Sequence, residues 1–420
     1  MNASESDTIH EDSAIHPDVR YILDTTQSIL EACGPRLAGT EASRKAGRLL
    51  EAEFHKSCDH TESEVFTHSA SIYSTLKVAV FAYVAASITL FLPAIHPLIP
   101  LFLYFVGAAY FFLVFILFKP YFDFLFPRRE CMNVHGIIEP SGEVRSQVLL
   151  SGHHDSGRVM QFMVHFQKLY AYRYMASAAA YGTGLLAAIL VLLQRTNVIS
   201  VAMPSWILPM ILFALSPLIF QLWTAMSPKG SPGAGDNLAS SVLMAKIGQR
   251  IKDLENDGKG RLKHVRVILA SFDSEETGFH GAKVFVREHR GELTSLKTIN
   301  LNYECLYHLH DLGFATTDQN GFVKLSSELA LKLHEIAERR GFESDLVKIP
   351  IGGGGTDASA FALAGIPATT ILGISTKPVR SGLVYHTPDD LVENLEPEIL
   401  EAVLDLSMEM LKELDENELE

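Results

Sequence analysis

Five short segments of the chain carry acidic and histidine side chains of the kind that hold a divalent metal ion. They are SGHHDS at 151–156, GAGDN at 233–237, SFDSEETG at 271–278, NYEC at 302–305 and YHTPDD at 385–390. Imidazoles and carboxylates are common ligands of such ions, and one of two adjacent glutamates can also move a proton. The five segments therefore indicate a divalent metal centre with acid–base chemistry beside it.

The first two segments offer a ligand and a bridge. His153 follows the apolar residues VLL, where we expect a strand to end. One ring nitrogen of His153 can bind a metal ion while Asp155 orients the ring through the other nitrogen. Asp236 lies in a Gly-rich turn that opens a predicted helix, where one carboxylate can bridge two ions. The alternative role for Asp236 is a helix N-cap.

The other three segments offer a base and further ligands. Glu275 and Glu276 repel each other, which favours a nearby cation or a shared proton, although a solvated acidic loop is the alternative. Glu304 follows the strand-like residues TINLNY, where a buried acid is costly without a partner. An edge strand with Glu304 facing water is its alternative. His386 precedes a Thr-Pro-Asp turn, and a surface turn is the alternative there.

The order of these segments resembles the di-zinc aminopeptidases of metallopeptidase family 28. That family reads H-x-D, G-x-x-D-N, E-E, an acid after an N-x strand, and Y-H-T. The segments GPRLAGTEASRKAGRLLEAEF at 34–54 and GIPATTILG at 365–373 also look like segments of that family. The resemblance covers most of the chain outside its long apolar stretches.

The resemblance implies two zinc ions per chain and a site residue for each role. One zinc would be held by His153, Asp236 and Glu304. The other would be held by Asp236, Glu276 and His386, so that Asp236 bridges the two.

The resemblance also implies catalytic roles and a substrate class. Glu275 would be the general base, and Asp155 would orient His153. The substrate would be a peptide with a free amino terminus, cut one residue at a time. Two alternatives stay open: a single-zinc acyltransferase similar to glutaminyl cyclases, and a peptidase-like scaffold without catalysis.

Composition and missing motifs exclude several other functions. The formal net charge of −14 argues against nucleic acid, because phosphate contacts need a basic surface. The four cysteines form no CxxC pair, so we expect no cysteine zinc knuckle and no disulfide framework. No GxSxG motif supports serine-based hydrolysis. GGGGTD at 352–357 lacks the lysine of a P-loop and predicts a flexible rim.

Long uncharged stretches separate the motifs and predict a lipid bilayer as a partner. A helix crosses the hydrocarbon core with about 20 residues. We therefore predict four spans in two hairpins, roughly 78–94, 98–118, 174–194 and 199–224. Buried core helices, or a kinked or re-entrant fourth segment, are the alternatives. The hairpins leave all five motifs on one side, and the Lys and Arg residues flanking them place that side in the cytoplasm.

The remaining chain alternates strands and helices. Strands are expected at 133–139, 147–151, 265–272, 297–303, 346–351 and 368–373, and helices at 18–57, 238–253, 325–340 and 396–414. Such alternation predicts an α/β fold with a mixed, mostly parallel sheet flanked by helices, here with two inserted transmembrane hairpins. By resemblance the sheet is of the zinc aminopeptidase type. Ligands of such folds bind at the carboxyl ends of strands.

The expected domain order follows from the inserted hairpins. An N-terminal helical part of the peptidase domain (1–75) precedes the first hairpin (76–118). The peptidase domain then supplies its first metal motif (119–168) before the second hairpin (169–228). Residues 229–420 complete the peptidase domain with the other metal and catalytic motifs.

Overall fold

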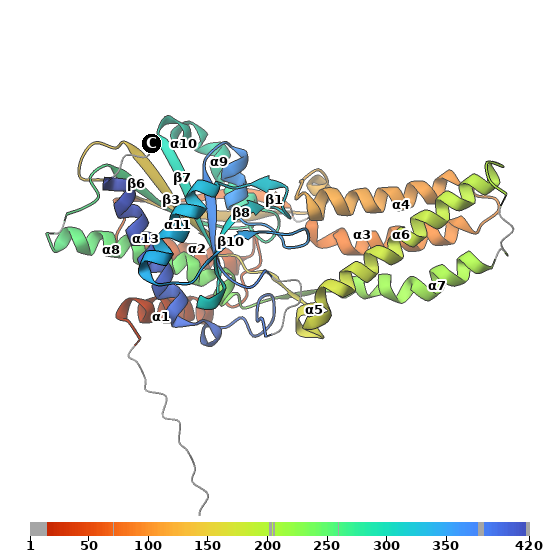
Figure 1. The fold of residues 1–420 in the computed structure, drawn as a ribbon, viewed down its shortest axis with the longest axis horizontal. Coiled ribbons are helices and arrows are strands. Elements are labelled where there is room, and N and C mark those ends of the chain that lie inside the picture. The colour runs from red at the N-terminus through yellow and green to blue at the C-terminus, as the bar shows by residue number, and fades with distance from the viewer. Residues whose placement is uncertain are drawn as a thin grey trace, which may run out of the picture.

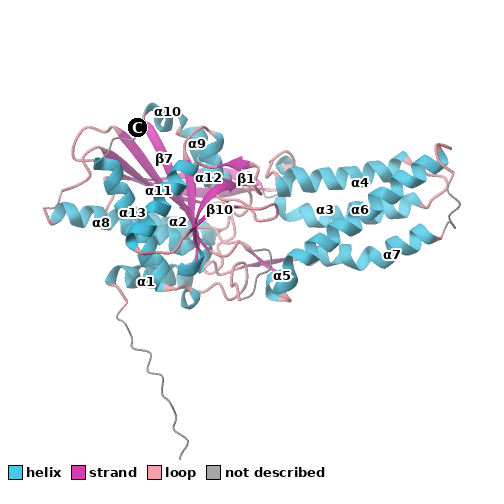
Figure 2. Ribbon diagram, viewed as in Figure 1, coloured by secondary structure: helices cyan, strands magenta, loops and turns pink. Residues whose placement is uncertain are grey.

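The protein consists of an α/β part and a bundle of apolar helices that projects from it (Figure 1). The computed structural model describes residues 15–69, 71–200, 204, 206–258, 260–376 and 382–416. Within these residues the α/β part is built on a nine-stranded sheet. Figure 2 shows helices packed around that sheet, with the bundle leaving one end of the α/β part.

The sheet is mixed, with a parallel centre. Its strands run in the order β1 (His60–Ser69), β2 (Arg128–Ile138), β6 (Val265–Phe272), β3 (Ser146–His153), β7 (Lys297–Leu306), β11 (Ala368–Gly373), β8 (Leu312–Asp318) and β10 (Asp345–Lys348), with β9 (Val323–Lys324) paired to β8. The central group is parallel and consists of β6, β3, β7 and β11. Strand β2 pairs antiparallel with β6 on one side of this group, and β8 pairs antiparallel with β11 on the other. The predicted α/β class with a mixed sheet is confirmed.

Both faces of the central strands are covered, which is why β3 is buried along its whole length. Val148 and Leu150 pack into one hydrophobic cluster and Leu149 into another, as alternation across a strand requires. The first cluster holds side chains of α1 (Pro17–Cys33), α2 (Glu41–Phe54), α8 (Ala239–Asn256), α11 (Ser327–Arg340) and α13 (Pro397–Glu416). The second holds side chains of α9 (His280–Glu288), α10 (Arg290–Ser295) and α12 (Ala358–Leu363).

One expectation about local structure was wrong, and strand β1 was missed. The single helix expected at 18–57 is two helices, because Gly34 ends α1 with φ of 66° and the Thr40 hydroxyl caps α2. Strand β1 was not predicted at all. Its sequence HTESEVFTHS carries polar residues on an edge of the sheet, so it lacks the apolar run that identifies a buried strand.

The bundle is formed by four apolar helices among the described residues. They are α3 (Thr75–Leu90), α4 (Leu98–Phe111), α6 (Tyr170–Arg195) and α7 (Ile207–Phe220). With the short helical turns that extend them, the first three are long and apolar enough to cross a membrane, judged by length and composition only. The fourth predicted span corresponds to a shorter apolar helix, Ile207–Trp223. Residues 201–203 and 205 of that predicted span lie outside the described residues.

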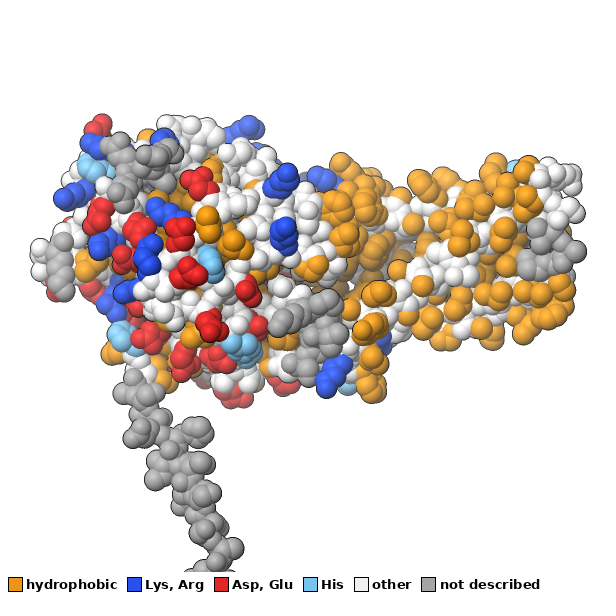
Figure 3. All heavy atoms as spheres, in the orientation of Figure 1, with side chains coloured by type: hydrophobic (Ala, Val, Ile, Leu, Met, Phe, Trp, Pro, Cys, Tyr) orange, Lys and Arg blue, Asp and Glu red, His pale blue; other side chains and the backbone are white. Residues whose placement is uncertain are grey.

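The outer surface of the bundle is apolar. Large side chains such as Phe81, Phe105 and Phe213 point away from the bundle and are 72%, 64% and 82% exposed. In the space-filling view, hydrophobic side chains cover the bundle, while charged side chains gather on the α/β part (Figure 3).

Candidate metal centre

The five predicted metal ligands converge at the carboxyl ends of the central strands. His153 is the last residue of β3, and Glu304 lies near the end of the adjacent strand β7. Glu276 follows β6 in the loop before α9. Asp236 lies in the turn before α8, and His386 comes from the loop before α13. Parallel strands bring these distant segments to one edge, as the sequence indicated.

Two groups of three donors share Asp236. In the first group, His153 Nε2 lies 3.2 Å from Glu304 Oε1 and 3.4 Å from Asp236 Oδ1. In the second, His386 Nε2 lies 3.0 Å from Asp236 Oδ2 and 3.1 Å from Glu276 Oε1. Within each group the donor atoms all lie within 4.8 Å of one another. Because each Asp236 oxygen faces a different histidine, this carboxylate is placed to bridge two ions.

Hydrogen bonds on the outer ring nitrogens aim both histidines at the centre. Nδ1 of His386 lies 3.1 Å from the Arg158 carbonyl oxygen, and Nδ1 of His153 lies 3.1 Å from the Asp155 carbonyl oxygen. Donation from Nδ1 leaves the Nε2 lone pair directed inward, which is the form that binds a metal ion. The Asp155 carboxylate also accepts from the backbone N–H groups of Glu275 and Glu276 at 3.1 and 3.3 Å.

The alternatives raised for these side chains do not fit their surroundings. Leu238, not Asp236, occupies the cap position of α8. Glu304 is buried on a central strand, and Glu275 is buried instead of lying in a solvated loop. His386 is buried as well. The structure thus brings all predicted site residues together, while their roles as ligands and base stay predictions.

Burial of many carboxyl groups makes the centre a site for cations. Burial raises the pKa of Glu276 to about 7, although the His386 imidazole opposes the shift. Burial also raises the pKa of Glu275 well above its usual value, against the effect of His153. For His153, burial favours the neutral form, yet Glu304 and Glu275 hold its pKa above the usual range. Positive charge inside the centre would relieve this repulsion among the carboxyl groups.

Details of the second group fit a metal ion. Glu276 Oε1 and His386 Nε2 are buried and face each other, yet neither makes a hydrogen bond with any described residue. A metal ion between them would satisfy both atoms. A Cβ atom on Gly157 would lie 2.4 Å from Glu276 Oε1 and 2.4 Å from His386 Cε1. Only glycine lets the backbone close around this group of donors.

Two residues of the site had no recognised role in the sequence. Arg36 is fully buried, and its guanidinium donates to the carbonyl oxygens of His154, Pro232 and Gly233, each at 2.7 Å. It therefore ties the loop after β3 to the turn that carries Asp236. In the sequence, the one indication of a role for Arg36 was that it lies in the segment 34–54, which resembles a segment of metallopeptidase family 28.

Asp357 is the second such residue. It ends the GGGGTD segment that was predicted to be a flexible rim, but it is fully buried. Neither of its carboxylate oxygens has a hydrogen-bond partner in the described part of the chain. Burial raises its pKa well above the usual value, and the nearby charges of His153 and Glu304 act on it in opposite directions. Asp357 is thus a further buried carboxyl group that belongs to neither donor group.

Comparison with known proteins finds a peptidase family over part of the chain. A family model described as Peptidase family M28 matches residues 223–411. Aminopeptidase YwaD of Bacillus subtilis (strain 168) is 28% identical over 182 residues, which are 42% of this chain and 36% of that protein. The match thus spans little more than a third of the relative's length.

Solved structures share the fold. A zinc aminopeptidase from Bacillus subtilis, BSAP, has a TM-score of 0.54 at 15% identity, with 94% of each chain covered. An Acidobacteriales bacterium glutaminyl cyclase has a TM-score of 0.53 at 13% identity, with 99% of each chain covered. At these identities the comparison concerns the fold alone.

The fold is shared with a solved zinc aminopeptidase and a solved glutaminyl cyclase. The family model described as Peptidase family M28 matches every donor segment except the first, but less than half of the chain. This match supports the prediction of a zinc metallopeptidase.

Proposed function

We propose that this chain is a membrane-anchored exopeptidase of the aminopeptidase type that uses two zinc ions to hydrolyse peptides. One observation carries the proposal: two groups of histidine and carboxylate donors share Asp236, with Glu275 beside them. The family match and the aminopeptidase relative support the reaction class.

Different residues of the site have different roles in the reaction. His153, Asp236 and Glu304 would hold one zinc, and Glu276 and His386 would hold the other together with Asp236. Zinc bound there polarises a carbonyl group and lowers the pKa of a water molecule.

Glu275 lies at the first group, with Oε2 3.7 Å from His153 Nε2, and belongs to neither donor group. It is free to take a proton from the attacking water and return it to the leaving amine. Asp155 positions both the base Glu275 and the ligand His153, because its carboxylate accepts a hydrogen bond from the Glu275 backbone N–H and lies 3.4 Å from His153 Nδ1.

A glutaminyl-cyclase-like reaction is the second candidate, because cyclases appear among the solved structures of the same fold. The number of zinc ions separates the two. An aminopeptidase mechanism needs both donor groups filled, whereas the cyclase alternative needs a single zinc. The completeness of both groups favours the peptidase.

Removing zinc is expected to abolish hydrolysis of aminoacyl amides and to lower the unfolding temperature. Zinc at about 1,000 times its dissociation constant stabilises a folded chain by about 4 kcal/mol. The measurement compares chelated and reloaded full-length protein in detergent by thermal unfolding, elemental analysis and activity.

The chain with His153→Ala and His386→Ala should hold two fewer zinc ions than the unaltered chain. A difference of one ion would favour the cyclase-like alternative.

Anchoring in a membrane is supported by the apolar bundle and its exposed aromatic surface. The chain is expected to sediment with membranes, to resist alkaline carbonate and to dissolve in detergent. Phe105→Asp should weaken this retention, because a charged residue at the centre of a span costs about 3 kcal/mol. Leu331→Asp, on the exposed side of α11, is the matched control and should change nothing. A chain that is soluble without detergent would contradict the proposal.

The cytoplasmic side for the catalytic part is also a proposal. Lys77 and Arg173 lie in the first turns of α3 and α6, Lys168 lies just before α6, and Lys229 follows α7 in β5 (Met226–Gly230). Positive residues beside spans favour the cytoplasmic side. Labelling of an introduced surface cysteine in intact and in opened cells would test the orientation.

A further inference from the structure

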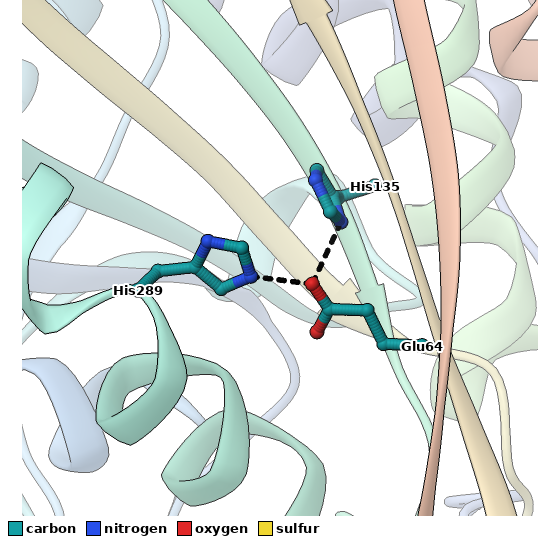
Figure 4. Close-up of side chains that lie close together, drawn as sticks. All are labelled: Glu64, His135 and His289. Atoms are coloured by element: carbon teal, nitrogen blue, oxygen red, sulfur yellow. Dashed lines mark hydrogen bonds and ion pairs between the residues drawn. The ribbon is translucent and has the colours of Figure 1, made fainter.

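A third group of side chains that could hold a metal ion shares no residue with the centre described above (Figure 4). Glu64 comes from β1, His135 from β2, and His289 from the junction of α9 and α10. Glu64 Oε1 pairs closely with His289 Nε2 and lies 3.7 Å from His135 Nδ1. The three donor atoms lie within 4.8 Å of one another.

The sheet register puts two of these donors on one face. In the antiparallel pairing of β1 with β2, Glu62 lies opposite His135, so Glu64 is its diagonal neighbour on the same face. Helix α9 packs against β1 and β2, and His289, which directly follows α9, points at the pair (Figure 4). Three segments distant in sequence thus converge on one point.

Two donor atoms of this group have unmet bonding capacity. His135 Nδ1 and Glu64 Oε2 are buried, and neither makes a hydrogen bond with any residue that the structure describes. The side chain of His135 is only 7% exposed. A buried polar atom without a partner costs about 1–3 kcal/mol. One cation between the three side chains would give His135 Nδ1 the partner that it lacks.

The surroundings support a metal ion further. The other nitrogen of the His289 ring, Nδ1, lies 3.7 Å from Glu292 Oε2, and Glu292 pairs with Arg266 at 3.2 Å. A carboxylate behind a histidine fixes the ring and strengthens it as a ligand. Glu64 and His289 also line a groove of about 970 Å³ along β1, through which an ion and a water molecule can enter.

Two similar groups lack these features and serve as comparisons. In the group His68, Asp123 and His280, the rings stack with centroids 3.8 Å apart, and His68 Nε2 bonds Thr277 Oγ1. Stacked rings do not direct two lone pairs at one ion. In the group His308, His310 and Glu396, both carboxylate oxygens are already bonded and His310 is 72% exposed.

We propose that Glu64, His135 and His289 bind a third divalent ion of the zinc class, with water as the fourth ligand. Two imidazoles and one carboxylate suit zinc and leave one tetrahedral position open. Such an ion would fasten the edge strand β1 to β2 and to the α9–α10 junction. Its role would be structural, and it is independent of the peptidase reaction.

The test uses the full chain in detergent with His153→Ala and His386→Ala, so that the first two ions no longer contribute. This background is expected to retain one zinc per chain after dialysis and to give the visible absorption of tetrahedral cobalt after exchange. Adding His289→Ala should remove both signals, whereas adding His310→Ala should leave them. A background without a retained ion, or an ion that survives His289→Ala, would overturn the proposal.

Affinity provides a second measurement if His289→Ala does not fold. Glu64→Gln in the same background should weaken zinc binding at least about 100-fold, and Glu292→Gln about 10- to 100-fold. Zinc should also raise the unfolding temperature of the background but not that of the Glu64→Gln chain. Equal zinc affinity in the background and in Glu64→Gln would overturn the proposal.

Discussion

Replacing Glu275 by glutamine is expected to lower the turnover of an aminoacyl-amide substrate by about 10²- to 10⁴-fold, the usual contribution of a general base. Glutamine keeps the size of the side chain but cannot accept a proton at neutral pH. Glu275 belongs to neither donor group, and its backbone is held by Asp155. Both zinc ions of the centre should therefore stay bound in the variant.

The adjacent residue gives a matched control. Glu276→Gln changes a side chain of the same type in the same loop, but Glu276 Oε1 is a donor of the second group. This variant should lose a zinc ion together with activity, whereas Glu275→Gln should lose only activity. In Glu275→Gln the loss should appear in kcat with little change in KM. Normal turnover in Glu275→Gln would rule out the proposed base.

The sequence predicted those strands whose apolar runs are buried on both faces. The expected ranges 265–272 and 368–373 coincide with β6 and β11. Strands β1 and β8 were missed, because an edge strand or a short mixed strand is held by its pairing more than by its own composition. The apolar helices of the bundle were predicted as well, because long uncharged stretches can be recognised in the sequence alone.

The centre was predictable for a related reason. Its ligands follow strand ends, and a parallel sheet brings such ends together whatever the length of chain between them. Arg36 and Asp357 gave no comparable signal. Their burial depends on tertiary contacts, and an arginine or aspartate in a loop usually faces water. The group of Glu64, His135 and His289 was missed because it joins an unpredicted edge strand to a helix junction.

Replacing Arg36 by methionine is expected to destabilise the α/β part, because each buried carbonyl oxygen that loses its donor costs about 1–3 kcal/mol. Burial lowers the pKa of Arg36 to about 10, so the guanidinium stays charged at neutral pH. Methionine fills a similar volume but leaves the carbonyl oxygens of His154, Pro232 and Gly233 buried without a donor. Lysine should rescue little, because one ammonium group cannot reproduce the planar fork.

Arg44→Met is the matched control for this prediction. Arg44 lies nearby on α2, pairs with Glu41 and donates to the Glu130 carbonyl oxygen, but its contacts are exposed. Its loss should cost less than about 1 kcal/mol. Thermal unfolding of the two zinc-loaded variants in detergent measures the difference. Arg36→Met should also weaken zinc binding, because Arg36 joins the loop after His153 to the turn that carries Asp236. Equal unfolding temperatures for the two variants would mean that Arg36 does not hold the centre together.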